Sequence, residues 1–443
     1  MFKAIKHPPL FRLWIGQALS SVGDEIYRVG LTWIAIGLIG ADTGYLAAGQ
    51  AAALMTLSFV GGRWADQWDA LRLMIRTDLA RMLIVFIPVI YAYFFKLNIG
   101  VLWVVALSLS GLSAFFDPAL QSCLPKFSSD LETLRSANGL MSTTVRLARM
   151  VGPAIVGLLA AFVPMIHFFT LDAATFAISA LSVYLVIHYQ IQSSAPAPAP
   201  APASASAPAP AQDRTMASGH PRRAIATKPP RSSRPSFSAA IRSGFEAVQR
   251  TPGFGYVMWA RAITGGTWNL AVTMGFALLV HHLTNGNPQA FGLAIASYGL
   301  GNFLGALVFG NLRRSRSEHM MYWGYILLGI GFIGIGSSPS MRWVLICAPF
   351  AGFCGPINDL AFIDMVQDKF AIAEIPRIFR FKMAIETAAT LLAMSASPTL
   401  FKSIGVGWTI VACGLVWVVC GLWGLRRHTP PAERACVSSE VVI

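Results

Sequence analysis

The chain is poor in charged residues, and the acidic ones are the rarest. Only 12% of its 443 residues are Asp, Glu, Lys or Arg, about half of the ~25% that soluble domains carry. Hydrophobic residues make up 55% of the chain, and the mean hydropathy is +0.58. A soluble globular protein is therefore excluded, because so much apolar surface requires a lipid environment.

Motifs for redox, metal or nucleotide chemistry are missing as well. The six cysteines show no CxxC spacing, which argues against a zinc site or a disulfide framework. No GxxxxGK[ST] phosphate-binding loop occurs, so ATP is excluded as an energy source within this chain. The sequence shows neither a cluster of metal ligands nor a nucleophile motif. We therefore expect no metal, no cofactor and no enzymatic activity.

Long hydrophobic runs dominate what is present. About twelve runs of roughly 20 mostly apolar residues follow one another, and ~20 helical residues are what a hydrocarbon layer of ~30 Å requires. Backbone groups in lipid must be hydrogen-bonded within the protein, so such runs form helices. The predicted fold class is all-α, a polytopic membrane protein with about twelve transmembrane helices in two six-helix bundles. The predicted spans are 13–37, 45–62, 73–94, 101–120, 137–163, 167–187, 256–280, 291–310, 320–336, 343–365, 378–401 and 406–425.

Lys and Arg are concentrated on one side of the predicted membrane. This side carries Arg63, Arg72, the basic spacer and both terminal segments, whereas the other side shows only Lys96, Arg342 and Lys402. By the positive-inside rule, both termini and the spacer face the cytoplasm of a bacterial inner (plasma) membrane. The same bias accounts for most of the net charge of +14, and no basic face with a nucleic-acid-binding motif appears. We also expect no cleavable signal peptide, because the first apolar run is too long for one.

A polar spacer divides the chain. Residues 195–211 are almost purely Ala, Pro and Ser, a composition that favours extended polyproline II and leaves nothing to bury. Basic residues follow, and residues 236–250 have the pattern of a short amphipathic helix that would lie against the inner leaflet. The spacer is either a tether or a docking element. We predict a bundle over 1–189, a cytoplasmic linker over 190–252, a second bundle over 253–428 and a cytoplasmic tail over 429–443.

The loop after the second predicted span resembles a family motif. Residues 62–72 read GRWADQWDALR, which is similar to the signature G-x-x-x-D-[R/K]-x-G-[R/K]-[R/K] of the major facilitator superfamily. The resemblance implies that Gly62 permits close helix approach. It also implies that Asp66 meets a neighbouring helix N-terminus, where the helix dipole favours an anion, with Arg72 in the same conformational motif. Gln and Asp replace the basic residue and the second glycine of the signature.

A second motif lies in the fifth predicted span. Residues 152–157 read GPAIVG, which resembles the G-P-x-x-x-G motif of the drug/proton antiporter branch of that superfamily. Gly152 and Gly157 lack side chains and Pro153 lacks a backbone donor, so the helix can bend and pack tightly. The fourth span lacks the intramembrane arginine of many drug exporters, so proton relays that need it are not carried over. Resemblance to macrolide-efflux and enterobactin (siderophore) exporters extends to 11–17, 116–121 and 171–176.

Acidic residues inside the predicted spans are candidates for proton coupling. An ionisable residue at mid-bilayer costs at least ~2.5–3.5 kcal/mol, so each needs a reason to be there. Asp24 and Glu25 lie near the middle of the first span, and Arg28 follows Asp24 by one turn. Either Asp24 pairs with Arg28, or one acid stays unpaired and binds a proton. The resemblance favours Asp24 and the helix geometry favours Glu25, while Asp172 and Glu386 are further candidates.

Basic and aromatic residues in the spans are candidates for a substrate path. Arg146 and Arg149 either hold an anionic substrate or pair with Asp117 and Asp172 on adjoining helices. Arg261 has no acid within one turn, so it reaches either the cytoplasmic surface or the cavity. The full set is Arg28, Arg146, Arg149, Arg261, Trp268 and Asn269.

Two local ion pairs and one helix break are also expected. Asp78 and Arg81 are three residues apart, and Lys382 and Glu386 are four apart. These spacings place both partners on one side of a helix. The Gly-Pro pair at 355–356 is expected to break the tenth span and to free backbone groups that need partners.

The leading functional prediction is a secondary active exporter driven by proton entry. It would carry an amphiphilic drug or a siderophore-like metabolite by alternating access between the two bundles. One alternative is a facilitator that moves lysophospholipid inward. The other is a transporter-shaped receptor or assembly protein that docks through the basic spacer. Expected partners are a small-molecule substrate, protons and the lipid bilayer, and a monomer is the expected state.

Overall fold

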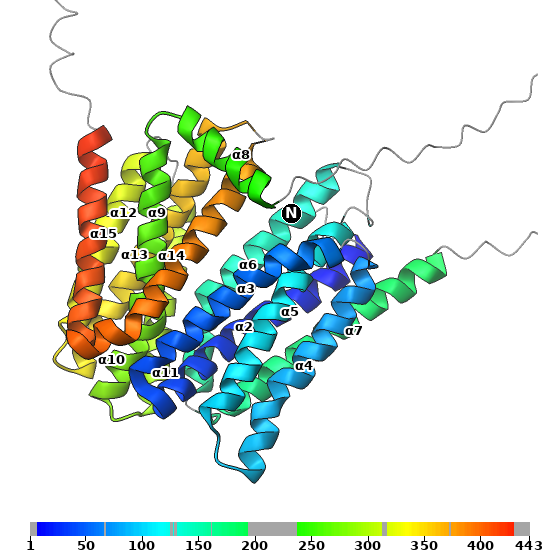
Figure 1. The fold of residues 1–443 in the computed structure, drawn as a ribbon, viewed down its shortest axis with the longest axis horizontal. Helices are drawn as coiled ribbons and strands as arrows, with labels where there is room; N and C mark the ends of the chain where they lie inside the picture. The colour runs from blue at the N-terminus through cyan, green and yellow to red at the C-terminus, as the bar shows by residue number, and fades with distance from the viewer. Residues whose placement is uncertain are drawn as a thin grey trace, which may run out of the picture.

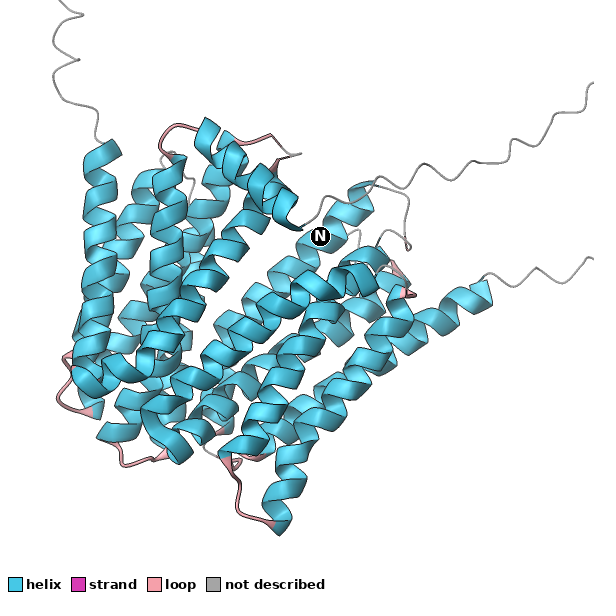
Figure 2. Cartoon of the chain, in the orientation of Figure 1, coloured by secondary structure: helices cyan, strands magenta, loops and turns pink. Residues whose placement is uncertain are grey.

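The computed structural model describes residues 7–65, 68–124, 127, 131–160, 162–193, 237–311, 317–371 and 374–428. Within these ranges the chain is helical, with short turns and without a strand (Figure 2). The prediction of an all-α protein is confirmed.

The helices before the spacer coincide with the predicted spans. Polar caps extend them slightly beyond their apolar parts: Asp69 accepts a hydrogen bond from the backbone N–H of Arg72 at the start of α4, and Asn98 does the same for Val101 at α5. A 3-10 turn, η1 (Gly40–Asp42), joins the first two helices. The first helix group consists of α2 (Pro8–Ile39), α3 (Thr43–Ala65), α4 (Ala70–Phe94), α5 (Ile99–Cys123), α6 (Leu131–Leu159) and α7 (His167–Ser193).

The helices after the spacer also match the predictions. The seventh predicted span is built from three consecutive segments, the middle one a π-helix. The second helix group consists of α9 (Phe254–Trp268), η3 (Asn269–Gly275), α10 (Phe276–Leu283), α11 (Pro288–Asn311), α12 (Ser317–Gly336), α13 (Met341–Lys369), α14 (Ile375–Ser403) and α15 (Val406–His428).

Eight helical stretches of the described residues are long and apolar enough to cross a membrane. The first of them, Pro8–Leu57, runs through both α2 and α3. Helices α4, α6 and α14, which each contain several charged residues, are not among the eight. By length and composition, the structure thus supports a multi-pass membrane protein without reproducing the full predicted number of spans.

The two helix groups lie side by side and diverge toward one end (Figure 1). In the first group α2 packs against α6 and α7, and α4 packs against α5 and α7. In the second group α12 packs against α13 and α15, and α11 packs against α13. Contacts between the groups are made chiefly by α6 with α11 and by α3 with α14.

The predicted amphipathic segment forms helix α8 (Phe237–Arg250). It packs against α14 and α9, with Val248 only 3% exposed and the Phe245 ring 5.8 Å from that of Phe381. Much of its apolar side is therefore covered by protein, which differs from the prediction that it lies against lipid. Helix α8, the start of α2 and the end of α15 lie at the same end of the molecule (Figure 1).

The expected break in the tenth span is wrong. Helix α13 runs without interruption from Met341 to Lys369 and includes both Pro349 and Pro356. Proline is tolerated within transmembrane helices because neighbouring helices and local adjustments satisfy the freed backbone groups. Here α11 and α12 pack closely on α13, so the helix keeps its course through both prolines.

Candidate functional site

The two helix groups meet tightly at the end opposite α8, here called the closed end. The Trp33 ring of α2 stacks on Phe291 of α11, with centroids 4.2 Å apart and 13° between the ring planes. Asp42 Oδ1 and Lys402 Nζ form an ion pair of 2.5 Å between the groups. The helices diverge toward the other end, here called the open end (Figure 1). The two groups are thus held together at the closed end by an aromatic stack and an ion pair.

Glycines allow the closed end to form. A Cβ added to Gly157 of α6 would lie 2.2 Å from the carbonyl oxygen of Gly292 on α11, and one on Gly44 would lie 1.8 Å from Ser397 Oγ. No side chain fits at such distances. Gly157 belongs to the predicted conformational motif, and the structure places it in this contact between the groups.

Halfway along the first helix group, Glu25 forms ion pairs with two arginines. Arg28 donates hydrogen bonds to Glu25 Oε2, one of them from Nε at 3.0 Å. The Nε of Arg149 on α6 lies 4.0 Å from Glu25 Oε1. The Glu25 side chain is 10% exposed, whereas those of Arg28 and Arg149 are 41% and 72% exposed. Gly152 makes room for this arrangement, because a Cβ there would lie 2.8 Å from Glu25 Cβ.

Asp24 has no such partner. Among the described residues its exposed side chain forms neither an ion pair nor a hydrogen bond. Its electrostatic neighbours include Arg81, Arg149 and the carboxylate of Asp117 on α5. Asp117 is also exposed. Within the described part of the chain, the unpaired Asp24 thus lies next to the paired Glu25, halfway along α2.

The expected pairing of these residues is corrected accordingly. Arg28 turns back to Glu25 at i−3 and not to Asp24 at i−4, so Glu25 is the neutralised acid and Asp24 the unpaired one. Arg149 likewise pairs with Glu25, and neither Asp117 nor Asp172 is its partner. The local Asp78–Arg81 pair is present at 3.6 Å.

A second charged network lies in the second helix group and is centred on Arg261 of α9. Arg261 donates from Nη2 to Asp359 Oδ1 of α13 at 2.7 Å and from Nε to Glu386 Oε1 of α14 at 3.2 Å. Lys382 Nζ lies 2.5 Å from Glu386 Oε2, as expected from their spacing. The Arg261 guanidinium also lies 5.3 Å from the centroid of Phe362. Arg261 therefore pairs with acidic residues of its own helix group, the second one.

Tyr298 of α11 lies within electrostatic range of both networks. Its hydroxyl lies near Trp268 and within electrostatic range of Arg28 of the first group and Asp359 of the second. Tyr298 is only 7% exposed. Tyr298 is therefore a buried residue of α11 close to charged residues of both helix groups.

Asn269 lies where the seventh span changes from α to π geometry. Its Nδ2 donates to the carbonyl oxygen of Gly265 at 3.1 Å and to Thr390 Oγ1 of α14 at 3.2 Å. Single turns of π-helix within an α-helix occur frequently at functional sites. Asn269 ties this segment to the helix that carries Glu386.

The remaining predicted site residues lie elsewhere or are not described. Gly62 lies in α3, and Asp66 is outside the residues that the structure describes. The side chains of Arg146 and Pro153 on α6 are also not described.

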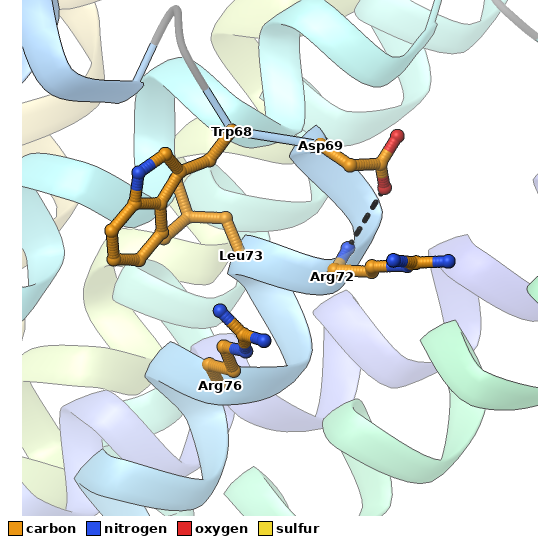
Figure 3. A pocket seen from close by; sticks show the side chains of 5 residues that line it. All are labelled: Trp68, Asp69, Arg72, Leu73 and Arg76. Carbon is orange, nitrogen blue, oxygen red and sulfur yellow. Dashed lines mark hydrogen bonds between the residues drawn. The ribbon is translucent and has the colours of Figure 1, made fainter.

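Arg72 lies in a cavity of about 220 Å³ at the start of α4 (Figure 3). The Arg76 guanidinium stands 5.8 Å from the centroid of the Trp68 ring there, and Asp69 and Leu73 complete the lining. This cavity is separate from the charged networks, whose residues lie further along the helices.

Two tyrosines of the site were not predicted. Tyr27 follows Asp24 by three residues, so the sequence could have predicted that it lies near Asp24 on the same side of the helix. Tyr298 carried no such signal, because only the packing of α11 against the first group brings it near Arg28.

Two helix groups that meet at one end and carry charged residues halfway along their length have the arrangement of a membrane transporter built from two bundles. Residues 2–200 match the family model described as a transmembrane secretion effector. Together with the curated relatives, this match supports a transporter of the major facilitator superfamily with efflux-type relatives.

Curated relatives match along nearly the whole chain. The chain is 25% identical over 431 residues to the multidrug efflux pump Tap of Mycolicibacterium fortuitum, covering 94% of this chain and 95% of the relative. It is 22% identical over 438 residues to the uncharacterized MFS-type transporter YfiS of Bacillus subtilis (strain 168), covering 94% and 93%.

Solved structures share the fold. The nucleoside transporter NupG superposes with a TM-score of 0.61 at 11% identity, covering 94% of this chain and 96% of the other. A bacterial homologue of the iron transporter ferroportin in its inward-facing state also gives 0.61, at 14% identity and with 94% and 98% covered. At these identities the likeness concerns the fold alone.

Proposed function

We propose that the chain is a proton-coupled exporter of small amphiphilic molecules in the bacterial inner membrane. The observation that carries this proposal is Asp24, an exposed carboxylate halfway along α2 that forms no ion pair with any residue that the structure describes. It lies next to Glu25, whose charge is already matched by Arg28 and Arg149. A carboxylate in that position can gain and lose a proton without dismantling the network. The multidrug efflux pump Tap, similar over the whole length, supports export as the direction.

In the proposed cycle, the open end faces the cytoplasm and the substrate enters there. Substrate binding between the helix groups favours release of the proton from Asp24, and the groups then close at the open end and separate at the closed end. A proton taken up from outside resets the transporter. Each proton that enters supplies ~2.3 kcal/mol per 100 mV of membrane potential, in addition to the pH gradient.

The charges between the helix groups support an amphiphilic drug over an acidic siderophore. The four described cations of the two networks face four carboxylates: Arg28 and Arg149 share Glu25 and lie beside Asp24, while Arg261 and Lys382 are matched by Asp359 and Glu386. No excess of cations is therefore available, among the described residues, to hold a chelator with several carboxylates or catecholates.

The export proposal is tested in a bacterial host that lacks its main drug pumps. Cells that express the chain should accumulate less ethidium than cells with an empty vector, and a protonophore should abolish the difference. Everted membrane vesicles should likewise show substrate-dependent proton release when ethidium is added. If a panel of amphiphiles of both charges gives no difference, with the protein verified in the membrane, the proposal is wrong.

We also expect both termini and the spacer to face the cytoplasm. Single cysteines at residues 190–252 or in the tail should resist a membrane-impermeant thiol reagent in whole cells, whereas cysteines at residues 284–287 should react. The physical reason is the concentration of Lys and Arg on the open-end side. Labelling of the spacer from outside would reverse the orientation and, with it, the direction of transport.

A further inference from the structure

Asp172 of α7 is a completely buried acid with no cation of its own. Its side chain is 0% exposed, and its Oδ2 has no hydrogen-bond partner. Its Oδ1 accepts one hydrogen bond of 3.3 Å from Thr175 Oγ1. Among the described residues it forms no ion pair. An ionised carboxylate in such a place costs several kcal/mol, and a buried group without a partner avoids that cost by holding a proton.

The helices packed on α7 offer no better partner. From α4, Asp78 and Arg81 face Asp172, but Arg81 pairs with Asp78 at 3.6 Å and its guanidinium lies 4.5 Å from the centroid of Phe116. From α2, Gly23 lets the backbone approach so closely that a Cβ there would lie 2.7 Å from Asp172 Oδ1. Among the described residues, Arg81 is thus the cation near Asp172, and it already forms an ion pair with Asp78.

A buried tyrosine hydroxyl lies near both this acid and the exposed Asp24. Tyr27 is 8% exposed, and its hydroxyl has no hydrogen-bond partner while it interacts electrostatically with both Asp172 and Asp24. Gly23, where an added Cβ would lie 2.7 Å from Asp172 Oδ1, precedes Tyr27 by four residues and Asp24 precedes it by three, so the three residues share one side of α2. A like charge nearby disfavours the ionised form of a carboxylate, and Asp172 is the buried one of the two acids.

We propose that Asp172 is an occluded proton-binding site, which exchanges its proton with Asp24 through the Tyr27 hydroxyl. This inference rests on the proposed proton-coupled export. In the exchange, the O–H bond of Asp172 breaks as its proton passes to the Tyr27 oxygen, while the proton of Tyr27 passes to the Asp24 carboxylate. Tyr27 is unchanged, Asp172 becomes the carboxylate, and Asp24 becomes the acid that faces the space between the helix groups. The proton is thereby stored away from the substrate and delivered where the substrate binds.

Infrared difference spectroscopy on the purified, reconstituted transporter tests the site without relying on transport. The wild type at neutral pH should show the C=O absorption of a protonated carboxylic acid that exchanges slowly with deuterium. Asp172→Asn should remove this band, whereas Asp24→Asn should retain it. Tyr27→Phe should retain the band and slow its deuterium exchange at least tenfold. Tyr184→Phe, on the same helix as Asp172 and 57% exposed, is the matched control and should change neither property.

The outcomes separate this inference from the proposed function. A wild type that exports in response to a pH gradient but lacks the band, or a band unchanged in Asp172→Asn, overturns the assignment of Asp172 and leaves the exporter proposal standing. A band that disappears in Asp172→Asn, in a protein without pH-driven export, supports the protonated site and refutes proton-coupled export. If Asp172→Asn does not fold, the Tyr27→Phe exchange rate decides, and exchange at the wild-type rate overturns the relay.

Discussion

Asp24→Asn is expected to abolish export driven by a pH gradient while leaving the protein folded. The substitution removes the titratable group and nearly preserves its volume. Because Asp24 has no ion pair among the described residues, no cation is left without a partner. In proteoliposomes, pH-driven accumulation of substrate should fall to the background of empty liposomes. Exchange of labelled for unlabelled substrate, which needs no net proton movement, should persist.

Glu25→Gln is the matched control for this prediction. It removes the carboxylate that binds Arg28 and Arg149, and hydrogen bonds to charged groups contribute about 1.5–3 kcal/mol each. The expected result is a lower melting temperature and lower expression, with proton coupling retained in the protein that folds. If instead Glu25→Gln loses coupling with unchanged stability and Asp24→Asn retains it, the roles of the two acids are the reverse of those proposed.

A cross-link across the closed end is expected to stop transport completely and reversibly. Asp42 and Lys402 form an ion pair of 2.5 Å between the two helix groups, so Asp42→Cys/Lys402→Cys can be joined by a short bifunctional thiol reagent. Alternating access requires these groups to separate, and a covalent link prevents it. Transport in proteoliposomes should fall to background on cross-linking and recover when a cleavable linker is reduced.

An ion pair inside one helix group provides the control. Lys369 of α13 and Glu318 of α12 are hydrogen-bonded within the second group, and Glu318→Cys/Lys369→Cys is linked by the same reagent. This link should leave most transport intact, because the helices of one group move together. Equal inhibition by both links would show that the closed end is not where the groups must part.

The hydrophobic runs of the sequence were sufficient to locate the helices. The first predicted span, 13–37, lies inside α2 (Pro8–Ile39), and the last, 406–425, lies inside α15 (Val406–His428). This works because a lipid environment leaves a backbone few choices apart from helix. Local pairs such as Lys382 with Glu386 were also predictable, since both residues share one helix side.

The ion pairs of the site could be predicted only in part from the sequence, as the first span shows. By spacing alone, Arg28 can reach Asp24 at i−4 or Glu25 at i−3. In the structure it pairs with Glu25. The choice depends on α6, whose Gly152 admits the Glu25 side chain and whose Arg149 adds a second cation. The sequence of the first span alone does not predict this contact with α6.

The sequence by itself determined the environment of this protein, its helices and the set of ionisable residues that they carry. Only the tertiary structure decided which acids are neutralised, which remain free, and at which end the helix groups meet. The physical reason is that helix formation follows from residues one turn apart. The state of Asp24, Asp172 and Arg261 depends instead on side chains from other helices, some more than 100 residues away in the sequence, as with Arg261 and Glu386.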